Sequence, residues 1–347
     1  MAGLGGGGTA AGGGSAGAAT GGGGASAGGA PSACHEAGPS GPLTTRLPCL
    51  LSETGLYGAD MTTLAGGVHP YSPSFELWSD GADKKRWVSL PAGSKIDTTD
   101  IDYWSFPAGT KLWKEFTRDG VRVETRLMQK QSSGAWYAVA YQWRADQREA
   151  DAVPNGVKDA SGTPHDVPNG DDCLTCHSQM PDKALGFSAI QLSHAKQDPS
   201  SALEWTLETL VKDGLLTTPP ALPFTVPGTA LDRDFFGYLH SNCGHCHNPK
   251  GTANTQTGLD LWLKVADLAG PVTGFSVYQG IFDRDIVWLD AEHPNAPKRI
   301  APGSLADSAM YQRFVEKAHT WSMPPLGTEV VDPAAKKLFE DWITAPR

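Results

Sequence analysis

The chain has 347 residues, 39% of them hydrophobic, and a formal net charge of −10 at pH 7. No run of about 18 apolar residues occurs, so we expect no segment that spans a membrane. The acidic balance argues against nucleic acid and anionic membranes as partners. The negative charge would favour docking on a basic patch of a partner protein. The alternative is that it only keeps the protein soluble.

Residues 1–33 are almost entirely Gly, Ala, Ser and Thr. Such a composition cannot bury a core, so we expect a flexible tether that could hold the protein at a membrane. No export signal is visible in this sequence, and the apolar run of a lipoprotein signal is missing before Cys34, which disfavours lipidation there. Cys34 and Cys49 flank a Pro/Gly-rich stretch, and we expect them to form a disulfide in an oxidising compartment.

Residues 34–150 predict an antiparallel β domain of the sandwich type that carries this disulfide-linked segment at its start. Segments 86–90, 121–127 and 136–143 alternate or are rich in β-branched and aromatic residues, and turn signals such as Asp119-Gly120 separate them. Six of the eleven tryptophans lie here. We expect them to form the core of the domain; a carbohydrate-binding platform or an aromatic wall against a cofactor are the alternatives.

Residues 151–225 contain the pentapeptide Cys173-Leu174-Thr175-Cys176-His177. A helix is predicted over residues 198–214, because Asp198 can cap it, Pro199 suits its first position, and an apolar stripe follows.

Residues 226–347 contain a second copy of the pattern, Cys243-Gly244-His245-Cys246-His247. A helix predicted over residues 232–242 leads directly into it. Asp332 and Pro333 predict the start of a last helix, and Met323 lies in a Pro-containing loop just before that helix.

Two cysteines on successive turns of a short helix can form thioethers to the vinyl groups of one haem, and the following histidine then lies under the iron. The two copies therefore predict two covalently bound haem c groups. A single Cys₄ zinc site is the main alternative, but zinc does not require a histidine after both pairs. A pair of thioredoxin-like redox motifs would need a preceding strand in a βαβ unit, and no such pattern surrounds either copy.

The sequence predicts the ligands of the second iron more completely than those of the first. His177 and His247 would bind the two irons, and Met323 suits the second iron because a soft thioether raises the potential of the haem. Arg299 would pair with a haem propionate, or belong to a plain surface turn.

The first iron lacks an evident sixth ligand. Met128 is our first choice, His194 the second, and an open position the third. An open position would permit peroxide chemistry, whereas two axial ligands imply electron transfer only.

The chain also resembles a family of bacterial dihaem c-type cytochromes of poorly defined role. The matching stretches are residues 51–57, 77–84, 106–111, 124–127, 185–188, 242–247, 299–304 and 323–327. The resemblance implies two haems, a location outside the cytoplasm and redox work. Residues 1–33 lie outside it.

Together these features predict an α+β multidomain chain. An antiparallel β domain would be followed by two small all-α cytochrome c-like haem domains, residues 151–225 and 226–347, the second of class I type. We expect a periplasmic or cell-surface electron carrier that exchanges electrons with other redox proteins and has no catalytic residue. A dihaem peroxidase, or a surface adaptor whose β domain binds a partner or a polysaccharide, are the alternatives.

Overall fold

The structure is a computed structural model that describes residues 48–287, 296–325 and 327–346. The chain divides into two units, residues 1–32 and 33–347, and all described residues belong to the second unit. The predicted tether and Cys34 lie outside the described residues. Cys49 is disulfide-bonded, as expected for one member of the predicted pair.

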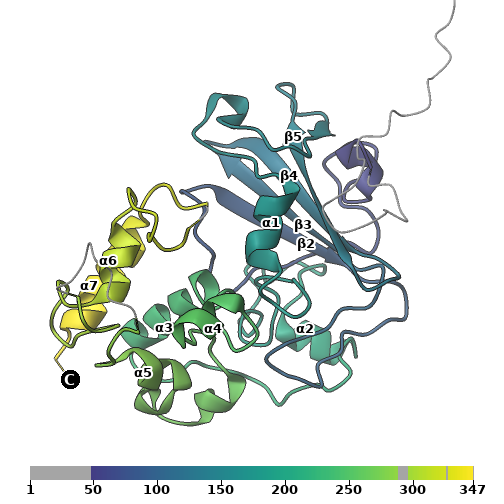
Figure 1. Ribbon diagram of the computed structural model, residues 1–347. Helices are drawn as coiled ribbons and strands as arrows, with labels where there is room; N and C mark the ends of the chain where they lie inside the picture. The colour runs from purple at the N-terminus through teal and green to yellow at the C-terminus, as the bar shows by residue number, and fades with distance from the viewer. Residues whose placement is uncertain (1–47, 288–295, 326, 347) are drawn as a thin grey trace, which may run out of the picture. The chain divides into compact units, whose positions relative to one another are not determined.

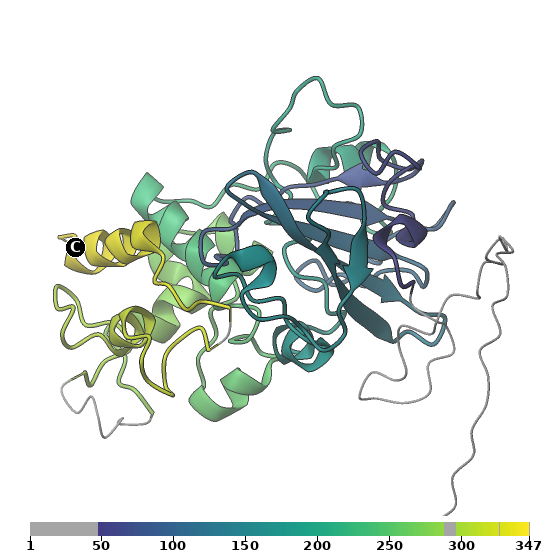
Figure 2. The ribbon, with the colours of Figure 1, turned by 90° about the horizontal axis from the view of Figure 1, so that it is seen from above.

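Six antiparallel strands form one sheet in the order of the sequence (Figures 1 and 2). The strands are β1 (His69–Pro70), β2 (Asp83–Ser89), β3 (Lys111–Arg118), β4 (Val121–Lys130), β5 (Trp136–Trp143) and β6 (Ala150–Ala152). Asp119 and Gly120 join β3 to β4, both with positive φ (50° and 78°). A two-residue hairpin of this kind matches the twist of the strands, which explains the predicted turn at these residues.

The two faces of the sheet cover different cores because side chains alternate along each strand. Trp87, Trp113 and Tyr141 pack on one face with Leu51 and Leu56 from the segment before the sheet. The other face carries Val88, Leu112 and Met128, which pack with residues 187–216. The predicted sandwich is therefore wrong in one respect: short helices and loops, not a second sheet, cover the faces.

The helices of the described residues are short. The 3₁₀ helices are η1 (Leu51–Thr54), η2 (Ala160–Gly162), η3 (Val265–Ala269) and η4 (Val272–Gly274). The α-helices are α1 (Gly170–His177), α2 (Leu207–Lys212), α3 (Ala230–Asn242), α4 (Thr252–Thr257), α5 (Ser276–Ile281), α6 (Ala309–Val315) and α7 (Pro333–Thr344).

The predicted pair of all-α haem domains is contradicted by this architecture. Residues 151–225 form the end of β6, α1, α2 and a 3₁₀ turn, and Phe187, Leu207 and Leu210 are buried in the same core as Val88 of the sheet. The helix predicted from Asp198 begins only at Leu207. Asp198 instead accepts hydrogen bonds from the backbone and hydroxyl of Ser200, which stabilise a turn.

The predicted helices at residues 232–242 and after Asp332 are confirmed as α3 and α7. Asp332 caps α7 through the N–H groups of residues 334 and 335, and Phe235 of α3 stacks on Trp342 of α7 with ring centroids 4.1 Å apart. These helices are also tied to the segment before β2. The Trp78 backbone N–H donates to Asn242 Oδ1 at 2.7 Å. The class I haem domain predicted for residues 226–347 is therefore not a separate all-α unit.

Candidate functional site

The first Cys-X-X-Cys-His sequence lies on α1. Asn169 caps the helix by accepting hydrogen bonds from the N–H groups of Asp171 and Asp172, at 2.8 and 3.0 Å. Cys173 and Cys176, both free thiols, are three residues apart, so they lie on one side of the helix. His177 is its last residue, and its Nδ1 lies 2.6 Å from the Lys183 carbonyl oxygen. A histidine held through Nδ1 presents Nε2 to a metal.

The second motif begins at the C-terminal end of α3. The Cys243 carbonyl oxygen accepts hydrogen bonds from the N–H groups of Cys246 and His247, at 3.1 and 2.9 Å. Gly244 sits against backbone: a Cβ there would lie 2.7 Å from the His240 carbonyl oxygen and 2.9 Å from that of Leu261. A glycine is therefore required at this variable position of the motif.

One cavity of about 690 Å³ joins the two motifs. Its size falls within the range of roughly 300–1,000 Å³ that is common for ligand and cofactor sites. All the predicted haem-attachment and iron-binding residues of both motifs line it. They are Cys173, Cys176, His177, Cys243, Cys246 and His247.

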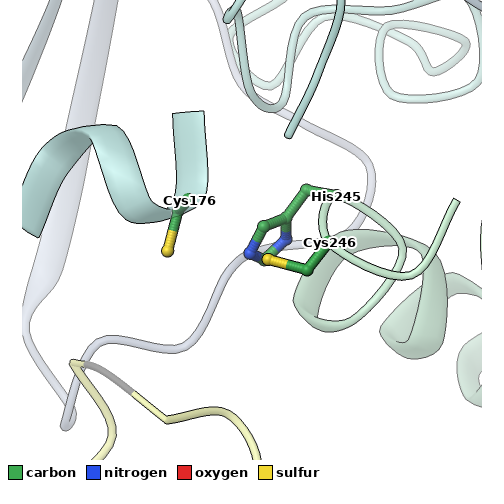
Figure 3. A group of neighbouring side chains, drawn as sticks. All are labelled: Cys176, His245 and Cys246. Atoms are coloured by element: carbon green, nitrogen blue, oxygen red, sulfur yellow. The ribbon is translucent and has the colours of Figure 1, made fainter. Parts of the chain in front are cut away.

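Cys176 of the first motif lies beside His245 and Cys246 of the second motif (Figure 3). Their sulfur and nitrogen ligand atoms all lie within 4.8 Å of one another. A hydrogen bond from the Cys246 thiol lowers the pKa of Cys176 to about 4, and the same hydrogen bond raises the pKa of Cys246.

Both motif histidines are neutral in this environment. Burial lowers the pKa of His177 to about 4 and that of His247 to about 4. A neutral imidazole keeps a nitrogen lone pair at physiological pH, which is the form that binds iron or zinc.

The structure brings Met323 and Arg299 to the same cavity. The Met323 backbone N–H donates to the Arg313 carbonyl oxygen at 2.8 Å, which fixes the start of its loop beside α6. The Arg299 guanidinium donates to the carbonyl oxygens of Thr257 and Gly280, both at 2.8 Å. Arg299 is therefore part of the cavity wall and not of a plain surface turn.

The two predicted ligands of the first iron differ in position. Met128 is on β4, is 8% exposed and lines the cavity. His194 lies elsewhere, with Nδ1 2.6 Å from the Ala195 carbonyl oxygen and Nε2 2.6 Å from that of Ser72. The structure does not bring His194 together with the motif on α1.

Three residues that the sequence did not single out also shape the site. Lys114 and Arg126 line the cavity from the sheet. Asn248 is fully buried directly after the second motif, and its Nδ2 donates to the carbonyl oxygens of Gly244 and His245 at 3.0 and 2.9 Å. The same nitrogen lies 3.7 Å from Met180 Sδ, just after the first motif. No spacing rule marks these residues, because their roles depend on packing between distant segments.

Comparison with models of protein families, with curated proteins and with solved structures finds no match. The resemblance to dihaem c-type cytochromes therefore stays a prediction. Within the described residues, no helix is long and apolar enough to cross a membrane, in agreement with the sequence.

Proposed function

We propose that this protein is a dihaem c-type cytochrome that works outside the cytoplasm and passes electrons between redox partners. The observation that carries the proposal is the shared cavity, which collects both pairs of free cysteines and both neutral histidines. The disulfide at Cys49 supports an oxidising compartment.

The residues of the cavity fit haem c. Each thiol can add across a vinyl group, so that sulfur bonds to one carbon and the thiol hydrogen goes to the other, with no net oxidation. His177 and His247 each offer a neutral imidazole, and Met323 offers a thioether beside the second motif. Bound haem iron supplies reversible one-electron transfer, while these residues would set its ligation and exclude water.

The cluster of Cys176, His245 and Cys246 favours a second candidate, a single zinc site. Two thiolates and an imidazole are three of the four ligands that a structural zinc prefers. This candidate leaves Cys173, Cys243 and both motif histidines without a role. Since these four residues line the same cavity, we favour the haem proposal.

The experiment is export of the chain in a bacterium with the haem-attachment machinery, followed by absorption spectra of the purified protein. Under the haem proposal, dithionite gives the sharp visible bands of ferrous haem c, and a small oxidised cytochrome reoxidises the protein. A colourless protein with stoichiometric zinc would establish the second candidate. Peroxide turnover would instead identify a dihaem peroxidase.

A further inference from the structure

The cavity face of the sheet carries a row of three cations. Arg86 of β2, Lys114 of β3 and Arg126 of β4 are direct cross-strand neighbours, since Lys114 pairs with both arginines in the antiparallel register. Like charges opposite one another destabilise a sheet unless other groups compensate them. Lys114 and Arg126 line the cavity, and their presence there therefore calls for a reason.

The two arginines have carboxylate partners. Arg86 Nη1 donates to Glu76 Oε1 at 3.1 Å. Arg126 donates to both oxygens of the fully buried Glu124, with Nε 3.0 Å from Oε2. His165 Nε2 also lies 2.7 Å from Glu124 Oε1, so this carboxylate is fully engaged.

Lys114 is different. In the part of the chain that the structure describes, no carboxylate or carbonyl oxygen pairs with its Nζ, which lies 4.9 Å from the centroid of the Phe116 ring. Burial, followed by the charges of Arg86 and Arg126, holds the pKa of Lys114 well below its usual range. The depressed pKa makes loss of the Lys114 proton easier than for an ordinary lysine, and Nζ lines the cavity without an oxygen partner among the described residues.

We propose that Lys114 Nζ is the sixth ligand of the iron that His177 binds. The assignment rests on the proposed function, because it needs a haem on α1. Lys114 and His177 line the same cavity, from the sheet and from α1 respectively. On coordination Nζ would release its proton and bind through the lone pair, and the one side chain of the row without an oxygen partner would gain a partner.

A haem propionate is the other group that could meet this amine. The positive charge of Arg126, the cross-strand neighbour of Lys114, lowers the pKa of the Cys173 thiol against the effect of burial. The cation row thus lies near the thioether attachment points. In haem c the propionates extend from the opposite edge of the macrocycle, which favours ligation over a propionate pair.

Met128 lies on the cavity face of β4, but its side chain requires no metal to complete its contacts. It packs among apolar side chains of the sheet core, including Leu112 and Trp136. A thioether is stable in such an environment because it leaves no strong polar atom without a hydrogen-bond partner. A primary amine in the same environment would leave its nitrogen without one.

The test uses the full chain with both haems attached. Lys114→Ala is expected to convert one of the two ferric haems from low spin to high spin in EPR and absorption spectra, and to let that haem bind cyanide. Added methylamine should restore the low-spin signal. Met128→Leu removes the competing thioether, and the low-spin signal should persist in this variant.

Other outcomes overturn the assignment. Spectra of Lys114→Ala that match the wild type show that the amine does not bind iron. An unchanged spin state with a shifted midpoint potential would identify a propionate partner instead. Loss of the low-spin signal in Met128→Leu would make the methionine the ligand. A wild-type chain without haem overturns the proposed function itself, and this is known before any variant is made.

Discussion

The Sγ atoms of Cys176 and Cys246 lie within 4.8 Å of one another, although Cys176 is on α1 and Cys246 lies in the turn after α3 (Figure 3). In the proposed holoprotein each sulfur bonds to the edge of its own haem. The two macrocycles would then approach each other at this point, and electrons would pass between them without an intervening protein layer.

This proximity predicts strongly coupled haems. We expect a split circular-dichroism signal in the Soret region of the oxidised protein, because neighbouring chromophores mix their transitions. The split should disappear in Cys243→Ala/Cys246→Ala, which retains only the first haem. An unsplit signal in a wild-type protein with two haems would contradict the predicted approach.

Asn248 is predicted to stabilise the second motif. Asn248→Ala removes the donor to the Gly244 and His245 carbonyl oxygens, and we expect the free energy of unfolding to fall by about 2 kcal/mol in urea titrations. The exposed neighbour Lys250 is the control, and Lys250→Ala should change stability by less than about 0.5 kcal/mol. Equal effects of the two substitutions would refute the role of Asn248.

Met323 is predicted to bind the second iron. In Met323→Ala we expect a lower midpoint potential for one haem, because loss of the thioether favours ferric iron, and cyanide binding at least tenfold tighter, about 1.4 kcal/mol. Met310 also lines the cavity, from α6, and Met310→Leu is the matched control. If only Met310→Leu altered the potential, the ligand assignment would move to that residue.

The motif residues that the sequence singled out line one cavity, whereas the predicted architecture is wrong. The spacing within each motif is local, so Cys173 and His177 could be recognised from sequence, and a capping residue such as Asp332 correctly marked the start of α7. The prediction of two independent haem domains was wrong because apolar periodicity does not reveal which surface a segment packs against. Leu207 and Leu210 read as the stripe of a helical domain but pack against the sheet.

Lys114 was missed for the same reason. In a strand that alternates between polar and apolar side chains, a lysine is expected to face water. The structure places it on the wall of a cavity that only the tertiary fold creates.

The buried side chain of His240 is expected to lower the stability of the fold at acidic pH. Burial lowers its pKa to about 3, and its Nδ1 accepts a hydrogen bond from the Leu263 N–H at 3.1 Å. Above pH 6.5 the residue is neutral in both the folded and the unfolded chain. As the pH falls, the unfolded chain takes up the proton first, so stability decreases between pH 6.5 and about 3.

The expected loss between pH 6.5 and 4 is about 3 kcal/mol from this residue. His240→Gln cannot titrate, so its free energy of unfolding should fall less steeply over that window. Urea titrations of both proteins at pH 4, 5, 6 and 7 measure the difference. Parallel pH profiles for the two proteins would show that His240 does not resist protonation.

The central claim, two haems attached through two motifs, is tested most directly by the mass of the intact, denatured chain after export in a haem-attaching bacterium. We predict the mass of the polypeptide plus two haems. Cys173→Ala/Cys176→Ala and Cys243→Ala/Cys246→Ala should each carry one haem. A wild-type chain at the bare polypeptide mass, with zinc found by metal analysis before denaturation, would contradict the claim.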